Sequence, residues 1–373
     1  MVRPASLRAL TRSGLRPASA ILGALTTLAA MVLAPAAISG DVNSVSAAAV
    51  SAQQAGAAQL MLSYNPRTGL IGTSWWQAAV ALTTLETYQQ ATGDTEYSFA
   101  IREAFTRNRS GSFENQADDD TSWWGLAWLQ AYDITHEKQY LAMAETDADY
   151  VHEDWDSTCG GGIWWLRSPR VYKNAIANEL FLELTAWLHN TIRGDTKYLN
   201  WAEAEWTWFK GSGMINRSHL INDGLTGSCT NNHQTTWTYN QGVILAGLAQ
   251  LYKATGDSRL LTEAERIARA AASRLTIGGV LQEPCTGTGC VSSTDKDPES
   301  FKGIFVRSLK VLAVTAGTSQ FNSFFTRQAQ SIEASNAGTA HQLGMFWAGP
   351  VADQSSFSQA SAEDALVAAI NLP

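Results

Sequence analysis

Three consecutive aspartates followed by a tryptophan pair form the part of the sequence best suited to chemistry. The segment reads Asp118-Asp119-Asp120-Thr-Ser-Trp123-Trp124. Aspartate is common in the first turn of a helix, because the helix dipole stabilises negative charge there, so an isolated acidic triplet usually has a structural role. Here the triplet adjoins two aromatic side chains, and the other repeats of the chain lack acid at the corresponding point. We therefore interpret these aspartates as candidate catalytic groups.

Two neighbouring carboxyl groups could hydrolyse a glycosidic bond. At a helix start they could lie about 5 Å apart, as in retaining glycosidases, whereas inverting glycosidases need about 6.5–9.5 Å. One group would be the nucleophile and the other the acid/base, provided that burial and mutual repulsion raise one pKa. The 14 tryptophans of the chain fit this chemistry, because flat aromatic side chains can hold the faces of sugar rings.

The elements that must position these groups recur along the chain. Apolar residues spaced at i, i+3, i+4 and i+7 predict helices, and period-2 alternation typical of strands is scarce. Each predicted unit opens on an aromatic or amide side chain and ends in a turn, so that a helix is followed by a second helix. The predicted first helices start near Trp75, Trp123, Asn174, Thr238 and Phe301, with turns at Gly93, His136, Gly194, Gly256 and Gly317. Residues 363–372 are interpreted as a closing helix without a partner of its own.

Helical pairs repeated every 45 to 60 residues or so form either an open solenoid or a closed ring. A solenoid would need polar capping repeats at both ends, but the terminal units, from Ala57 and Ala360, are apolar. We therefore predict an all-α closed ring, with one helix of each pair inside and the other in an outer shell. The tryptophan pairs at the starts of successive inner helices would then gather at one mouth, where we expect the chemistry.

Composition and charge exclude several classes of protein. The chain has 373 residues, of which 45% are hydrophobic, and this content rules out a disordered protein. A net charge of -8 disfavours a nucleic-acid partner, because such binding neutralises phosphates. The six histidines show no spacing typical of metal ligands, so we expect no catalytic metal and no cofactor. We expect a monomer.

The first residues have the pattern of a secretory signal peptide. Four arginines precede an apolar run at 21–33 and the small residues Ala34-Pro35-Ala36. An N-terminal membrane anchor is the alternative interpretation, although the run is short for a bilayer. We expect cleavage near residue 36, a mature chain of residues 37–373 that forms one catalytic domain, a mature charge of -8 - 4 = -12, and secretion. No signal for a GPI anchor is visible at the C-terminus.

The four cysteines fit an oxidising compartment. Cys285 and Cys290 flank a flexible Thr-Gly-Thr-Gly loop that could close as a local disulfide, which by elimination leaves Cys159 to pair with Cys229. A zinc site is the rival hypothesis, but no Cys-x-x-Cys occurs. Asn108-Arg-Ser and Asn216-Arg-Ser are glycosylation sequons, which matter only if the source is eukaryotic.

Five motifs in order resemble glycoside hydrolase family 76, the endo-α-1,6-mannanases, across essentially the whole mature chain. They are Asp119-Asp120-x-x-Trp123-Trp124, Cys159-Gly-Gly-Gly-Ile-Trp164-Trp165, Lys173-Asn174-Ala-Ile-Ala-Asn178-Glu179, Trp237-Thr-Tyr239-Asn240-Gln241-Gly242 and Phe301-Lys302-Gly303-Ile-Phe-Val-Arg307. The resemblance implies an (α/α)6 barrel and retaining hydrolysis of internal α-1,6-mannosidic bonds. It implies that Asp119 is the nucleophile and Asp120 the acid/base. This register comes from the two-residue gap before Trp123, and it leaves Asp118 to support the site or cap the helix.

The remaining motif residues are candidates for substrate binding, each with a structural alternative. The run at 160–162 is interpreted as a tight loop beside the sugar, because no strand and no Lys-Ser/Thr accompany it as in a phosphate cradle. Lys302 and Arg307 could orient carboxylates, although Arg307 could equally pair with a structural acid. The other candidates are Trp123, Trp124, Asp118, Trp164, Trp165, Asn174, Asn178, Tyr239 and Asn240.

Three functional hypotheses remain open at this point. The first is a secreted endo-mannanase whose partner is an α-mannan polysaccharide or oligosaccharide. The second is a cell-wall transglycosidase on the same scaffold, which would pass the retained intermediate to a sugar acceptor at the mannose core of GPI-type glycans. The third is a binding module without activity, against which the intact aspartate pair argues.

Overall fold

The structure is a computed structural model that describes residues 42–284 and 296–373. The expected signal peptide, residues 1–36, lies outside the described residues, as do Cys285 and Cys290. In the part of the chain that the structure describes, no helix is long and apolar enough to cross a membrane.

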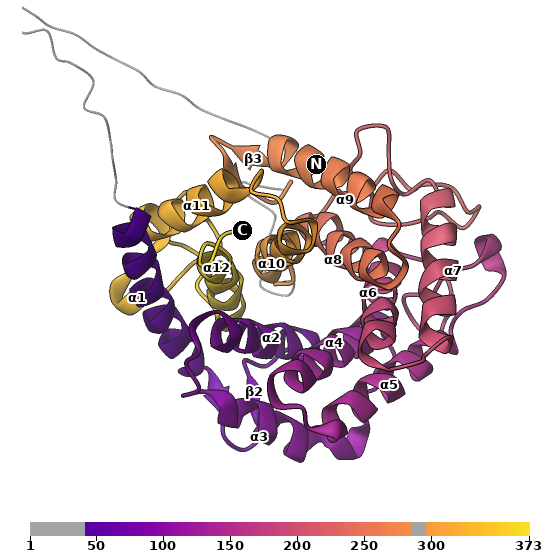
Figure 1. The fold of residues 1–373 in the computed structure, drawn as a ribbon, viewed down its shortest axis with the longest axis horizontal. Coiled ribbons are helices and arrows are strands. Elements are labelled where there is room, and N and C mark those ends of the chain that lie inside the picture. The colour runs from indigo at the N-terminus through magenta and orange to yellow at the C-terminus, as the bar shows by residue number, and fades with distance from the viewer. Residues whose placement is uncertain (1–41, 285–295) are drawn as a thin grey trace, which may run out of the picture. The chain divides into compact units, whose positions relative to one another are not determined.

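The described residues form a closed ring of inner helices inside an outer shell of helices (Figure 1). Each inner helix packs against the next, and the last packs against the first, which closes the ring. The expected all-α (α/α)6 barrel is therefore confirmed. The inner helices are α2 (Trp75–Thr92), α4 (Asp118–Thr135), α6 (Ala175–Thr191), α8 (Thr238–Thr255), α10 (Pro298–Ala316) and α12 (Ser356–Ala368).

The outer shell and the connections complete the described fold. The outer helices are α1 (Val42–Met61), α3 (Ser98–Asn108), α5 (Lys138–His152), α7 (Lys197–Gly211), α9 (Ser258–Arg274) and α11 (Asn322–Ser331). Two short hairpins pair β1 (Tyr64–Asn65) with β2 (Leu70–Ile71) and β3 (Thr276–Ile277) with β4 (Val280–Leu281). Short 3-10 turns lie at Arg109–Gly111, Thr158–Gly160 and Thr339–His341, and a π turn at Ile332–Asn336.

The two shells differ in their apolar pattern because they bury different fractions of their surface. The outer helix α9 buries one stripe, Leu260, Ala264, Ile267, Ala268 and Ala271, and presents charged residues outward. The inner helix α6 is buried along nearly its whole length, since it contacts two inner neighbours and the outer shell. A helix that is apolar on all sides is enclosed by other elements. The inner helices have this pattern, so they could be predicted from the sequence.

The predicted closing helix is present as α12, but its bounds and its lack of a partner were predicted incorrectly. The helix α12 begins at Ser356, seven residues before the predicted start, because the Ser355 hydroxyl accepts bonds from the backbone N–H groups of Phe357 and Ser358 and caps it. It also has partners, since it packs against α11 and against α1 from the other end of the described chain. The ring is closed by contacts between segments about 300 residues apart, which local periodicity does not reveal.

Close approach of inner helices depends on glycines without side chains. A Cβ placed on Gly303 of α10 would lie 2.4 Å from the Cα of Ser361 on α12. A Cβ on Gly242 of α8 would lie 2.5 Å from the Cα of Phe305 on α10. Backbone atoms cannot move aside as a flexible side chain can, so these two glycines set the spacing between three inner helices.

We expect Gly303→Ala to lower the free energy of unfolding by about 1–3 kcal/mol, because overpacking forces the backbones of α10 and α12 apart. Chemical denaturation monitored by circular dichroism measures the change. Gly211→Ala is the matched control, since nothing lies within 4 Å of a Cβ at that helical position. Equal stability of the two variants would show that the ring tolerates a wider spacing.

Candidate active site

The acid pair lies at the start of α4, where free backbone N–H groups and the helix dipole favour negative charge. Both side chains are partly buried. Asp119 accepts two hydrogen bonds: one from the backbone N–H of Asp120, with an N–O distance of 3.1 Å, and one from the indole N–H of Trp165, also at 3.1 Å. Asp120 accepts one from the side-chain amide of Asn115 at 2.7 Å.

The environment raises the pKa of both acids. Burial raises the pKa of Asp119 well above its usual range, and the neighbouring charge of Asp120 adds to this. Burial and the carboxylate of Asp297 raise the pKa of Asp120 to about 7. Two adjacent carboxyl groups that repel each other hold one proton between them near neutral pH. Asp119 has two N–H donors and Asp120 has one, and the two donors of Asp119 lower its pKa against the effect of burial.

Aromatic rings from four inner helices surround the acid pair. The Trp76 ring stacks on Trp123, with centroids 5.9 Å apart and planes inclined by 28°, and its other neighbour is Phe301 at 6.3 Å. The Tyr239 ring stacks on Phe301 at 3.8 Å. The negative charge of Asp119 contributes to the raised pKa of Tyr239. The expected gathering of aromatic side chains from helix starts at one mouth is therefore present.

Two further acids lie at this mouth, which corrects the expectation that other repeats lack acid at the corresponding point. Asp297 directly precedes α10 and accepts a hydrogen bond from the Trp76 indole at 3.2 Å. Asp223 lies in the connection before α8, accepts a hydrogen bond from the Tyr172 hydroxyl, and contributes to the raised pKa of Tyr239. The sequence missed both because neither is part of an acidic run; a cap position before a predicted helix was the one available signal for Asp297.

A loop at 153–174 carries Trp165 to the acid pair and is fastened to the start of α4. The backbone N–H of Asp118 donates to the Trp165 carbonyl at 3.0 Å, and the backbone N–H of Arg167 donates to the Gln116 carbonyl at 2.9 Å. The Arg167 guanidinium lies 3.6 Å from the Asp118 carboxylate and 3.1 Å from that of Asp154. This network holds the indole of Trp165 against Asp119.

Asp118 is part of this network, in agreement with the expected supporting place beside the acid pair. Its side chain is fully buried and points toward Asp154 and Arg167. Burial and the neighbouring carboxyl of Asp154 raise the pKa of Asp118 to about 9, against the opposing effect of Arg167. Because its side chain is fully buried against Arg167 and Asp154, Asp118 presents no exposed oxygen at the mouth.

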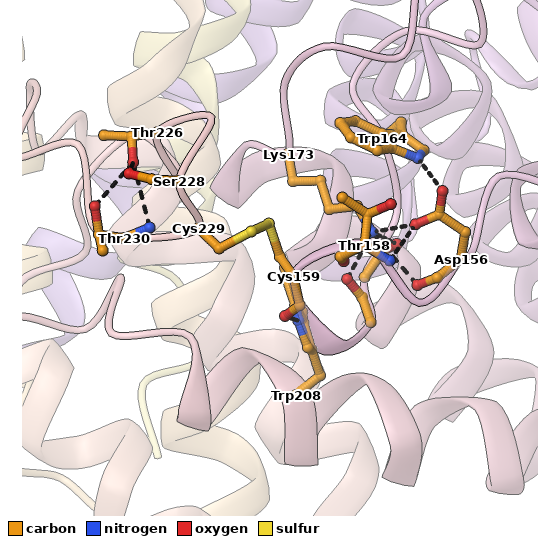
Figure 2. The surroundings of a disulfide bond; sticks show 12 residues. Asp156, Thr158, Cys159, Trp164, Lys173, Trp208, Thr226, Ser228, Cys229 and Thr230 are labelled. Carbon is orange, nitrogen blue, oxygen red and sulfur yellow. Dashed lines mark hydrogen bonds and ion pairs between the residues drawn. A yellow bond between two sulfur atoms is a disulfide. The ribbon is translucent and has the colours of Figure 1, made fainter.

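The glycine-rich part of the loop encloses the ammonium group of Lys173 (Figure 2). The Nζ donates to the Asp156 carboxylate at 2.9 Å and to the carbonyls of Thr158, Gly161 and Gly162 at 2.9, 2.6 and 2.8 Å. A Cβ on Gly162 would lie 2.4 Å from the Trp208 ring. The glycine-rich part of the loop is folded around a cation of its own chain, so its carbonyls, and not its N–H groups, surround the enclosed charge.

Trp164 belongs to this loop core, whereas Trp165 faces the site. The Trp164 indole donates to the Asp156 carboxylate at 2.9 Å, its ring lies 4.8 Å from the Lys173 Nζ, and only 8% of the residue is exposed. Trp165 is 38% exposed. Of the two alternatives, Trp164 has the structural one, because it stabilises the loop through a buried cation–π contact.

A disulfide joins this loop to the connection before α8 (Figure 2). Cys159 and Cys229 are bonded, with their Cα atoms 5.1 Å apart, as the elimination argument predicted. The connection that holds Cys229 also holds Asp223 and contacts Tyr172 through Asn232. The disulfide therefore links the two segments that bring Trp165 and Asp223 to the mouth.

Known proteins were compared with the chain on the basis of its sequence and its fold. Residues 47–371 match the sequence profile of Glycosyl hydrolase family 76. The chain belongs to this family. A mannan endo-1,6-alpha-mannosidase of Saccharomyces cerevisiae is 30% identical over 251 residues, which are 62% of this chain and 55% of the relative. A mannan endo-1,6-alpha-mannosidase of Candida albicans is 27% identical, over 75% of this chain and 66% of the relative.

The chain thus spans less than two thirds of the length of the first of these curated relatives. Among solved structures, an α-1,6-mannanase from Salegentibacter matches with a TM-score of 0.78 at 25% identity, over 86% of this chain and 98% of that one. An inactive variant of that mannanase, with two consecutive aspartates changed to alanine, is complexed with α-1,6-mannotetrose and matches with a TM-score of 0.79 at 24% identity, over 87% of this chain and 99% of that one.

Several other predicted substrate contacts lie in the protein interior. Trp124 is fully buried in a cluster with Trp75 and Trp128. The Asn174 side chain caps α6 by accepting from the Ala177 N–H, and the Asn178 side chain bonds both backbone groups of Ile163. The two amides thus have the structural partners that were the alternative for them.

The fifth inner helix also departs from the prediction. The Lys302 Nζ donates to the Met345 carbonyl and lies 5.1 Å from the Trp347 ring, so it fastens α10 to the segment before α12 and does not orient the acid pair. Arg307 pairs with Asp364 at 2.9 Å, the structural alternative. Asn240 is fully buried, and its amide has no partner among the described residues.

Both glycosylation sequons remain predictions. The amide nitrogen of Asn108 donates to the Thr68 and Ala104 carbonyls, at 2.9 and 2.8 Å. That of Asn216 donates to the Asn222 side chain at 2.9 Å. A glycan would replace one of the two hydrogens on each nitrogen, so glycosylation of Asn108, which donates both, would break one of its hydrogen bonds.

We expect replacement of both bonded cysteines, Cys159→Ser with Cys229→Ser, to lower the free energy of unfolding by about 4 kcal/mol. The reason is that the bond closes 70 residues of chain, whose entropy in the unfolded state it restricts. Thermal unfolding measures the loss. Ser228→Ala, in the same turn as Cys229, should leave the melting temperature unchanged. A double variant that melts with the oxidised wild type would contradict the bond.

Proposed function

We propose that the protein is a retaining endo-acting glycoside hydrolase that cleaves internal α-1,6-mannosidic bonds of mannan backbones. The observation that carries the proposal is the pair Asp119 and Asp120 at the start of α4, with donors that distinguish the two carboxyl groups. Membership of family 76 supports the reaction class. The mannan-cleaving names of the relatives support the substrate.

Asp119 is the proposed nucleophile. Its two N–H donors and the helix dipole favour the carboxylate, which would attack the anomeric carbon and form a covalent mannosyl intermediate. Trp165 is the positioning residue that fixes the attacking oxygens. In a second displacement, water attacks the anomeric carbon from the face opposite to Asp119 and breaks the mannosyl–Asp119 bond. Two inversions leave the configuration retained.

Asp120 is the proposed acid/base. With a pKa of about 7 it holds a proton at mildly acidic and neutral pH, which it would donate to the departing glycosidic oxygen. It would then remove a proton from the incoming water in the second step. A group whose pKa lies near the working pH can both donate and remove a proton efficiently, as these two steps require.

The aromatic rings and the cysteines support the remaining parts of the proposal. Trp76, Trp165 and Tyr239 present flat surfaces around the acids, as the faces of mannose rings require. A disulfide such as Cys159–Cys229 persists in oxidising compartments, which is consistent with export after removal of residues 1–36. We propose that the exported protein acts as a monomer.

The decisive experiment follows products from linear α-1,6-mannan with the mature protein and two variants. We expect oligosaccharides that initially retain the α configuration. Asp120→Asn should lower kcat/KM by about 10²–10⁴-fold, the usual contribution of an acid/base, and Asp119→Asn should lower it further because no intermediate forms. Proton NMR of the anomeric signals gives both rate and configuration.

Asp118→Asn is the matched control for these variants. An asparagine keeps the shape of the protonated Asp118 beside Arg167, so this variant should retain far more activity than the other two. Activity that survived Asp120→Asn but not Asp118→Asn would shift the catalytic pair by one residue. Products found only when a sugar acceptor is added would indicate a transglycosidase instead.

The second prediction for this reaction concerns its pH dependence. Since Asp120 must be protonated to act as the acid, kcat/KM should decline above about pH 7. The negative charge of Asp297 raises the pKa of Asp120, so Asp297→Asn should lower that pKa and move the decline to lower pH. A pH profile of kcat/KM for mannan hydrolysis measures the shift.

Glu263→Gln on the outer helix α9 is the control for this profile, because it removes one carboxylate far from the mouth. Its profile should coincide with that of the wild type. An unchanged decline in Asp297→Asn, or a move to higher pH, would contradict the assignment of Asp120 as the group that titrates.

A further inference from the structure

A cavity of about 700 Å³ lies among the six inner helices, on the side away from the acid pair. Its walls come from the C-terminal halves of these helices, and its outer rim includes Ala91, Thr191 and Val314 at their ends. Binding sites for small molecules usually enclose about 300–1,000 Å³. The cavity therefore has the size of a ligand site, and neither the acid pair nor its loops line it.

Amide side chains in the wall have hydrogen-bonding groups to spare. The Gln130 amide donates to Gln90 at 3.0 Å, and the Asn190 amide donates to the side-chain oxygen of Gln250 at 3.1 Å. The Asn190 amide also donates to the Gln250 backbone carbonyl at 2.9 Å, while the amide nitrogens of Gln90 and Gln250 and the side-chain oxygens of Gln130 and Asn190 have no partner within residues 42–284 and 296–373. Groups of this kind are suited to a ligand that both donates and accepts hydrogen bonds.

The wall carries three acidic and three basic side chains. Its carboxyl groups are Asp133, Glu183 and Asp364, and its cations are Lys253, Arg307 and Lys310; burial raises the pKa of Glu183 to about 8, so this carboxyl adds no anion at neutral pH. Because all six inner helices end here, their free carbonyl groups disfavour an anion, while the three cations disfavour a cation. A neutral, hydroxyl-rich ligand meets no net repulsion.

Two tryptophans supply flat surfaces. The Trp187 indole bonds the Asp133 carboxylate, and the residue lies in the wall. Trp123 closes the inner end of the cavity, with its stacking partner Trp76 toward the acid mouth. A saccharide could therefore find aromatic faces and amides in one enclosure, separated by Trp123 from the catalytic groups.

We propose that this cavity is a second carbohydrate-binding site, which takes a short neutral saccharide through the mouth opposite to Asp119 and Asp120. The choice of α-1,6-mannotriose as the probe rests on the proposed function, since such saccharides are the products expected at the mouth that holds Asp119 and Asp120 (the front mouth). The shape and chemistry of the cavity do not depend on that choice.

Calorimetric titration with α-1,6-mannotriose tests the proposal. The protein is the full mature chain that carries Asp119→Asn and Asp120→Asn, so that the probe is not cleaved. We expect two sites. Adding Thr87→Trp, which fills the cavity from α2, or Trp187→Ala, which removes an aromatic wall, should weaken one site at least ten-fold and leave the other unchanged.

Trp165→Ala in the same background is the matched control, because it alters only the front mouth and should weaken only the other site. Thermal unfolding of each variant verifies that it is folded. A single site that Trp165→Ala weakens, or a second site that survives both Thr87→Trp and Trp187→Ala, would overturn the inference. Binding in the cavity without binding at the front mouth would support the inference and count against the proposed function.

Discussion

Repulsion between two adjacent carboxyl groups is the constraint on which the acid mouth depends. Asp119 and Asp120 are partly buried neighbours, and without donors both would be protonated and unreactive. The indole of Trp165 supplies one donor to Asp119. Trp165 can do so only because its loop is folded around Lys173 and tied to a second loop by Cys159. A buried cation and a disulfide some distance from the acids thereby help to hold the Trp165 donor against Asp119.

The ring gives its two mouths opposite properties. All six inner helices begin at the acid mouth, where free N–H groups favour negative charge, and end at the other, where free carbonyls disfavour it. Acids gather at the first mouth, as Asp223 and Asp297 illustrate. At the second, carboxyl groups are offset by cations such as Arg307, which pairs with Asp364. Because the inner helices all run in the same direction, the acid pair and the cavity proposed to bind a neutral saccharide lie at opposite ends of the ring.

The inner helices could be predicted well from the sequence. Because they are buried on nearly all sides, the apolar residues of each segment are enough to identify it without its partners. It predicted single residues less well where two partners were equally plausible. An amide at a helix start can bind a sugar or the backbone, and Asn178 binds the backbone of Ile163. A lysine beside a tryptophan can orient an acid or fasten a loop, and Lys302 fastens a loop. The start of α12 was missed for a related reason, since its outer partner α1 lies at the far end of the described chain.

The helical period explains why three consecutive aspartates have different surroundings. Successive residues of a helix are separated by about 100°, so the triplet spans about 200° of α4. Asp118 falls on the side of Arg167 and Asp154, which bury it. On the same wheel Trp123 falls between Asp119 and Asp120, and it supports that face from one turn below, next to Trp76. The two-residue gap between the acids and the tryptophans therefore places Trp123 on the side of the helix that both acids share.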